Sequence, residues 1–353
     1  MPEASGPCAL EPPGGLMILS RRLLIAAGAA LALPRALRAQ APRRPPLAAT
    51  LEAARGLDQL HAIVVAQGGE TLVAEALRGP APDRAVNVKS VSKTLVAALL
   101  GAALDRGAVP ALGATLGEVA PGLIPAEADP RVRDLTLEDL VTMRAGLERT
   151  SGGNYGAWVS SRNWLAYALS RPMVAEPGSR MLYSTGSFHI LGAALSEATD
   201  RSLLALMRDW LGRPLGIEIP PWTQDPQGFY LGGNEMALSP LALLRLGEMV
   251  RQGGRWDGAQ VLSADWVRRS LEPRTRSPFS GLGYGYGWFV GRAGTERIAL
   301  ARGYGGQLVC LLPDLEATVV VTSDPTRPAR SEGYFGDLMR LIGEVVAPEL
   351  RRA

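Results

Sequence analysis

The sequence predicts an α/β (α+β) fold, in which an antiparallel sheet formed by the N- and C-terminal segments is flanked by helices and a mostly helical domain is inserted. β-rich runs lie near the two ends of the chain, at residues 61–67 and from residue 283 onward, whereas the middle has helical spacing and helix caps. The 353 residues are 47% hydrophobic, enough for one large core or two smaller ones. We expect a sheet domain at 42–95 and 280–353 and a helical domain at 96–279.

Residues 1–41 have the pattern of a signal peptide. Arg21-Arg22 precedes an apolar run over 23–33, and Ala39-Gln40-Ala41 forms a small-x-small cleavage site. The paired arginines are typical of twin-arginine export, in which the folded protein crosses the membrane. An N-terminal anchor is the alternative, but the run is shorter than the roughly 20 residues that span a bilayer. We therefore expect a periplasmic or secreted protein without a stable membrane anchor after signal removal, and Met17 is a candidate start.

The apolar spacing then predicts the elements in order. Residues 47–60 have helical spacing, and 61–67 alternate into Gly68-Gly69, a two-residue hairpin signal. An apolar helix follows at 90–106. The remaining predictions are helix starts at Thr136 and Ser239, four strands within 284–290, 296–301, 307–313 and 317–323, and a final helix at 335–346.

Composition excludes several classes of function. Without residues 1–41, Lys+Arg falls to 33 against 32 Asp+Glu, so the mature chain lacks the basic surface that nucleic-acid binding needs. His61 and His189 are the only histidines and have no metal-ligand spacing, so we expect no metal and no organic cofactor. Cys8 lies in the leader and leaves Cys310 alone after processing, which excludes an intramolecular disulfide in the mature chain.

Lysine usage points to the chemistry. Of 37 basic residues, 35 are Arg, and only Lys89 and Lys93 are Lys. An amine can lose its proton near neutral pH whereas a guanidinium cannot, so a lysine here indicates a need for a neutral base. Ser90 and Lys93 lie three residues apart, on one face of the predicted helix. Alternatively, Ser90 is a helix cap and Lys93 a solvated first-turn residue, although a cation there opposes the helix dipole. The pattern favours a nucleophile beside its base.

Ser90-Val91-Ser92-Lys93-Thr94 resembles the first motif of the serine β-lactamase and penicillin-binding-protein superfamily. The stretches at 135–147, 175–195, 232–247 and 302–315 are similar to landmarks of its class C-like branch. Within that branch, the Tyr-Ser-Thr-Gly and Gly-Tyr-Gly-Gly-Gln motifs most resemble those of serine hydrolases that include 6-aminohexanoate-dimer hydrolases and esterases. The resemblance spans nearly the whole mature chain and implies the β-lactamase-like fold.

The resemblance also implies catalytic roles. Ser90 would be the nucleophile, Lys93 the base that takes its proton, and Tyr183 a proton relay. The oxyanion hole would use the backbone N–H groups of Ser90 and Tyr304, with Gly303 as the alternative second donor. His189 is expected to pack on the helix after Tyr183 rather than to catalyse.

Five residues are predicted to bind substrate, and some depart from the family pattern. Thr185 stands where the second motif usually has Asn, and Arg302 begins a stretch that replaces the usual Lys-Thr-Gly or His-x-Gly. These changes weaken a β-lactamase assignment, although Arg302 can hold a carboxylate. Tyr155 and Trp158 either line the cleft or pack under a loop. Gly305 permits a close approach of substrate or simply forms a turn.

The sequence therefore predicts an exported serine hydrolase that cleaves a small ester or amide through an acyl-enzyme on Ser90. A D,D-peptidase or β-lactamase is the enzymatic alternative. A catalytically silent β-lactamase-like binding protein is the alternative of another class, which intact Ser90, Lys93 and Tyr183 disfavour. A Ser-His-Asp hydrolase is weaker still, because no Gly-x-Ser-x-Gly motif is present.

Overall fold

The computed structural model describes residues 47–352. The predicted signal peptide, with its twin arginines and the candidate start at Met17, lies outside the described residues.

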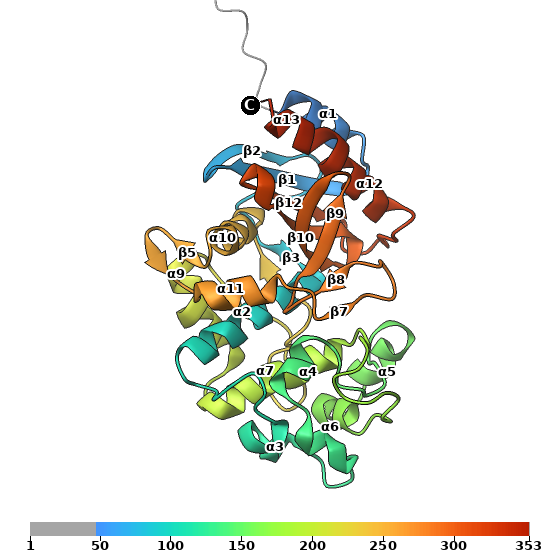
Figure 1. Ribbon diagram of the computed structural model, residues 1–353. Helices are drawn as coiled ribbons and strands as arrows, with labels where there is room; N and C mark the ends of the chain where they lie inside the picture. Colours follow the sequence, from blue (N-terminus) through green and yellow to red (C-terminus); the bar gives the residue numbers. More distant parts are fainter. Residues whose placement is uncertain (1–46, 353) are drawn as a thin grey trace, which may run out of the picture. The chain divides into compact units, whose positions relative to one another are not determined.

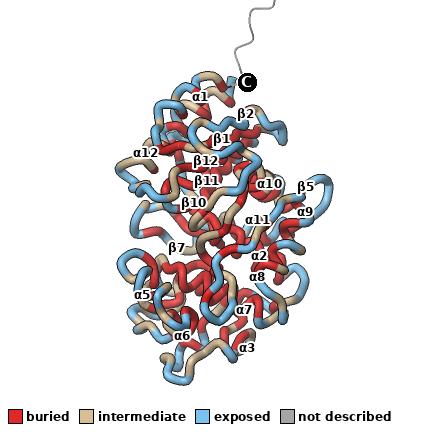
Figure 2. The backbone as a smooth tube through the Cα atoms, turned by 180° about the vertical axis from the view of Figure 1, so that it is seen from behind, coloured by how far each residue is buried: buried red, intermediate tan, exposed pale blue. Residues whose placement is uncertain are grey.

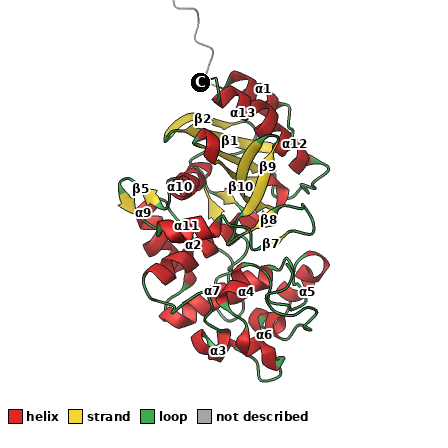
Figure 3. Cartoon of the chain, viewed as in Figure 1, coloured by secondary structure: helices red, strands yellow, loops and turns green. Residues whose placement is uncertain are grey.

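An eight-stranded antiparallel sheet joins the two ends of the described chain, as the sequence predicts (Figure 3). Its order is β2-β1-β12-β11-β10-β9-β8-β7, so the first strand of the chain pairs with the last. β11 and β12 are buried along their whole length, which explains why their sequences are continuously apolar rather than alternating. The strands are β1 Leu60–Gln67, β2 Glu70–Ala76, β7 Thr275–Arg276, β8 Gly283–Tyr284, β9 Phe289–Ala293, β10 Glu296–Gly303, β11 Gln307–Leu312 and β12 Ala317–Ser323.

The predicted hairpin between β1 and β2 is present. Gly68 and Gly69 both have positive φ, at 59° and 90°, and the type of two-residue turn that fits a twisted hairpin requires this at both positions. The turn sets the register of β1 against β2 beside the hairpin, where Gln67 pairs with Glu70.

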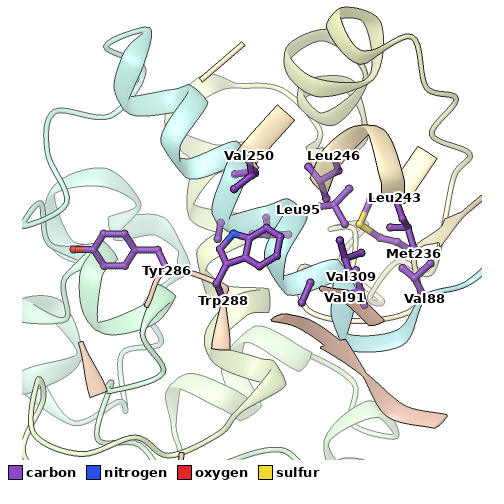
Figure 4. Packing of buried hydrophobic residues seen from close by; sticks show 14 of the residues in the cluster. Val88, Val91, Leu95, Met236, Leu243, Leu246, Val250, Tyr286, Trp288 and Val309 are labelled. Carbon is purple, nitrogen blue, oxygen red and sulfur yellow. The ribbon is translucent and has the colours of Figure 1, made fainter. Parts of the chain in front are cut away.

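Helices cover the sheet on both faces. α10 (Pro240–Arg251) and α2 (Ser92–Asp105) lie on one face, where Val309 of β11 meets Leu95 and Leu246 (Figure 4). α10 comes so close that a Cβ on Gly247 would lie 2.7 Å from the Thr318 side chain. The other face carries α1 (Ala48–Arg55) and α12 (Tyr334–Arg340), which continues through the π-helical turn η8 (Leu341–Val346) into α13 (Ala347–Leu350). α10 thus packs on the sheet, although the predicted boundary at 279 grouped it with the helical domain.

Below the sheet in the view of Figure 1, α3, α4, α5 and α6 gather around α7 (Thr185–Thr199). α2, α4 and α6 pack against α7, and Figure 2 shows buried residues running through this region. α4 begins at the predicted cap, because Thr136 and Asp139 form a reciprocal capping box. The bounds are α3 Leu116–Val119, α4 Leu137–Val141, α5 Tyr155–Val159, α6 Trp164–Leu169, α8 Leu203–Met207, α9 Arg213–Leu215 and α11 Ala264–Ser270, with short strands β3 Val86–Asn87, β4 Ala237–Leu238, β5 Arg255–Trp256 and β6 Ala259–Gln260. Within residues 47–352, no helix is both long and apolar enough to span a bilayer.

Candidate active site

Ser90 and Lys93 meet at the start of α2. Ser90 lies in a 3₁₀ turn, η1 (Lys89–Val91), that leads directly into the helix. Val88, just before this turn, and Val91, its last residue, are fully buried and anchor it to the core (Figure 4). The Ser92 hydroxyl donates to the Lys89 carbonyl at 2.6 Å and tightens the turn further. As a result, Lys93 Nζ lies 3.0 Å from Ser90 Oγ, within reach for proton transfer.

Lys93 is buried, with 2% of its surface exposed. Its Nζ contacts the Gly233 carbonyl oxygen at 2.6 Å and the Thr185 hydroxyl at 3.2 Å, in addition to Ser90. Burial lowers the pKa of Lys93 because a charged amine loses its hydration, and the interaction with Tyr183 opposes this effect less strongly. The site thus favours the neutral amine that a general base requires.

Tyr183 lies two residues before α7 and close to Lys93. Its ring centre is 5.0 Å from Nζ. The backbone N–H of the preceding residue, Leu182, donates to the Met143 carbonyl at 2.8 Å, which fixes this approach. Burial lowers the pKa of Arg302 to about 10, and the Tyr183 hydroxyl opposes this effect less strongly. The three predicted catalytic side chains are therefore brought together.

The Thr185 hydroxyl, which contacts the base Lys93, is itself held by neighbouring hydroxyl groups. Thr185 begins α7, and its Oγ1 lies 3.0 Å from Ser151 Oγ, which in turn accepts the Thr185 backbone N–H. The neighbouring Thr150 hydroxyl accepts the Gly186 N–H at 2.8 Å. Thr185 was predicted to bind substrate, but here it contacts the base itself. Ser151 was not singled out from the sequence, since a lone serine in a loop carries no distinctive signal.

The end of β10 approaches the Ser90 turn closely. A Cβ on Gly303 would lie 2.5 Å from the Val88 carbonyl oxygen, so only glycine allows this contact. Tyr304, 52% exposed, follows directly, and its backbone thus lies near the nucleophile's turn. Gly305 instead serves the turn into β11: it has φ 81°, and a Cβ there would meet the Asp324 carbonyl oxygen at 2.3 Å. The contribution of Tyr304 to an oxyanion hole stays a prediction.

The structure corrects the expectation that Trp158 lines the cleft. Its side chain is fully buried, donates to the Trp164 carbonyl at 2.9 Å and packs edge-on against His189. Burial of the large indole ring among apolar side chains under this loop is more favourable than its exposure to solvent. Tyr155 is only half-buried, and its hydroxyl accepts a hydrogen bond from Asn234 at 3.0 Å, beside the segment that contacts Lys93.

Arg302 faces away from Gly303, because side chains alternate along β10. Its guanidinium stacks 3.5 Å from the centre of the Phe335 ring on α12 and donates to the Ala329 carbonyl. In this placement it ties the terminal helix to the sheet, and a contact with a substrate carboxylate stays a prediction.

His189 lies on α7, the helix after Tyr183, with its side chain packed in the core, as expected. It is fully buried, and its Nε2 lies 3.0 Å from Asp225 Oδ2. Among residues 47–352, no group of three or more His, Cys, Asp or Glu side chains is arranged to hold a metal ion.

Two site features were missed by the sequence analysis. The Gly233 carbonyl, which contacts Lys93, is a backbone group and leaves no trace in residue type. Lys89, by contrast, had a signal: it is the other of the two lysines, and it forms an ion pair with Glu235 next to Ser90. Because lysine is rare in this arginine-rich chain, Lys89 could have been singled out for the same reason as Lys93.

A serine and a buried lysine at a helix N-terminus, set beside the end of an antiparallel strand, define the class of serine hydrolases with a Ser-x-x-Lys centre. The family model described as "Beta-lactamase" matches residues 58–344. The chain therefore belongs to the beta-lactamase family and has its fold.

Individual relatives agree with this assignment. The chain is 27% identical over 311 residues to the D-alanyl-D-alanine-carboxypeptidase/endopeptidase AmpH of Escherichia coli K12, covering 77% of this chain and 79% of that protein. A candidate 6-aminohexanoate-dimer hydrolase from Bacillus anthracis superposes with a TM-score of 0.71 at 16% identity, covering 86% of this chain and 81% of its own. EstCE1, a hydrolase with promiscuous acyltransferase activity, gives a TM-score of 0.69 at 18% identity, covering 85% and 98%. At these identities the two structures share the fold.

Proposed function

We propose that the protein is an exported serine hydrolase that cleaves an ester or amide bond through an acyl-enzyme on Ser90. The observation that carries the proposal is the 3.0 Å contact between Ser90 Oγ and the buried amine of Lys93. A serine hydroxyl is a weak nucleophile, and an adjacent neutral base is what activates it.

In the first step, Lys93 Nζ takes the hydroxyl proton as Ser90 Oγ attacks the substrate carbonyl carbon. The backbone N–H groups of Ser90 and Tyr304 hold the developing oxyanion. The proton then passes, directly or through Tyr183, to the departing alcohol or amine. In the second step water attacks the acyl-enzyme, the base takes a proton from the water, and Ser90 regains its own. The reaction as proposed needs no metal or organic cofactor.

The test combines a fluorophosphonate probe, a short-chain p-nitrophenyl ester and mass spectrometry on the purified mature protein. Ser90 should carry the adduct, and Ser90→Ala should abolish labelling and lower turnover by about 10³-fold or more. Ser331→Ala, at an exposed serine in the turn before α12, is the matched control and should keep wild-type rates. A folded protein that neither labels nor turns over ester would instead support the silent binding protein.

A D,D-peptidase is the second candidate, because the relative from Escherichia coli carries that activity in its name. Release of D-alanine from a peptide ending in D-Ala-D-Ala, at a rate above that for the ester, would favour it. Nitrocefin tests the β-lactamase alternative, which Thr185 in place of Asn disfavours.

The export part of the proposal rests on the pattern of residues 1–41, which lie outside the described residues. Under this proposal the mature enzyme acts in the periplasm or outside the cell. Its substrates there are small esters or amides.

A further inference from the structure

Both lysines of the chain lie at the active site, but the proposed reaction uses only Lys93. Lys89 immediately precedes Ser90, and its Nζ contacts Glu235 Oε1 at 3.0 Å. Both side chains are partly buried, at 21% and 27% exposure. We propose that Lys89 and Glu235 are positioning residues: their ion pair holds the segment 233–236 so that the Gly233 carbonyl orients the base. The inference rests on the proposed function and deepens it.

The segment 233–236 is fastened to the turn around Ser90 at several points besides the ion pair. The Met236 N–H donates to the Ser92 hydroxyl at 3.2 Å, and the Met236 carbonyl accepts the Val88 N–H at 2.9 Å. Asn87 donates to Glu235 Oε2 while its own side-chain oxygen accepts the Lys89 N–H at 2.9 Å. Glu235 is thus the point where this segment and the nucleophile's turn are joined through side chains.

The backbone at both ends of the ion pair lies in the left-handed region. Lys89 has φ 50° and Glu235 has φ 66°, and neither is a glycine. Such conformations persist only where the surroundings determine them, and they concentrate at functional sites. The ion pair and the Asn87 contacts hold the backbone in this conformation at both Lys89 and Glu235.

The Gly233 carbonyl matters because of the geometry of a neutral amine. A neutral Lys93 has two N–H bonds and one lone pair, and its Nζ has three polar neighbours. If the N–H bonds point to the Gly233 carbonyl and the Thr185 hydroxyl, the lone pair is left for the proton of Ser90. Displacing Gly233 would let the amine rotate and lose this alignment. Glu235, two residues further on, fixes where Gly233 lies.

The ion pair also explains why this position is Lys in a chain whose usual cation is Arg. The single ammonium takes one carboxylate oxygen of Glu235 and leaves the other to Asn87. A guanidinium binds both oxygens of a carboxylate as a fork and would displace Asn87.

The experiment compares Glu235→Ala and Lys89→Met with wild type and Ser90→Ala. Each of the two variants should lower kcat for the p-nitrophenyl ester, and the rate of fluorophosphonate labelling, by about 10- to 100-fold while KM changes less than about threefold. Lys89→Arg should lose less activity than Lys89→Met, because it keeps the charge. The matched control is Arg297→Met, which breaks the ion pair with Asp314 at the other end of β10 and should be neutral.

A spectroscopic readout makes the test independent of turnover. Protein labelled with ¹³C at the lysine ε-carbons has only two such signals, and Lys89→Met assigns the one from Lys93. Glu235→Ala should shift the Lys93 signal, whereas Arg297→Met should not. An unchanged Lys93 signal with unchanged kcat, a change confined to KM, or equal loss in Lys89→Arg and Lys89→Met would each overturn the inference. Absence of Ser90-dependent turnover in wild type would refute the proposed function instead, and the Lys93 signal would still decide the positioning role.

Discussion

Lys93 determines the pH dependence expected of the enzyme. Burial lowers its pKa, so the neutral amine is populated at a lower pH than for a solvated lysine. Acylation needs the neutral form, and kcat/KM should therefore fall as the pH drops through the pKa of Lys93 in the free enzyme. The limb should lie below the ordinary lysine value of about 10.4.

The two-signal ¹³C spectrum measures the same group directly. The Lys93 signal should titrate together with the acidic limb of kcat/KM, and Lys89, in an ion pair at the surface of the site, provides an internal comparison. A Lys93 that titrates at the ordinary value, or a kcat/KM profile without an acidic limb, would contradict its role as the base.

For individual residues, the sequence predicted the contacts that local spacing determines. Ser90 and Lys93 are three residues apart, so a helical turn alone brings them together. Thr185 and Ser151 meet only because α7 packs against a loop 34 residues earlier in the chain, and no local pattern encodes that contact. Trp158 was misplaced for the same reason, since its burial depends on Trp164 and His189.

Among the elements, β10 carries the backbone donor that we propose for the oxyanion hole. Its last residue, Gly303, touches the Val88 carbonyl where any side chain would collide with backbone. Gly303→Ala should push the strand and Tyr304 away from the Ser90 turn, and loss of one oxyanion donor lowers kcat by about 10²- to 10³-fold. Kinetics on the p-nitrophenyl ester, with thermal melting to verify folding, measure the effect.

The matched control is Gly291→Ala on the neighbouring strand β9. A Cβ there would meet only the end of the flexible Leu282 side chain, which can move aside. Wild-type kcat in Gly303→Ala would show that the approach of β10 to the turn has no part in catalysis.

Elements with strong periodicity or caps were predicted well, and those defined by packing were not. The hairpin at Gly68-Gly69 and the cap at Thr136 have local causes and appear where expected. The packing of α10 on the sheet was not predicted, because its amphipathic pattern shows that one face is buried, but not against which partner. The 3₁₀ turn at Ser90 was predicted as regular helix, since apolar spacing does not distinguish the two over so short a segment.

At the scale of the whole molecule, the sheet requires both ends of the described chain. β1 pairs with β12, so the sheet is complete only when segments near both ends of the described chain are in place. Cys310 is fully buried, and burial raises the pKa of its thiol, which makes it unreactive. No disulfide is needed to complete this core. Folding before export through the twin-arginine route stays a prediction from residues 1–41.

Export in the folded state gives a test of the proposed localisation. Replacing Arg21 and Arg22 together by Lys keeps the charge of the leader but removes the paired arginines that the folded-protein export route recognises. We expect the precursor to accumulate in the cytoplasm in a form whose Ser90 still reacts with the fluorophosphonate probe, because folding precedes export. Cell fractionation followed by probe labelling measures both properties.

The control replaces Arg35 and Arg38 by Lys, which makes the same two substitutions in the leader outside the motif and should leave export intact. Undiminished export of the Arg21/Arg22 variant, or a cytoplasmic precursor that the probe does not label, would argue that the chain crosses the membrane unfolded and acquires its active site only afterwards.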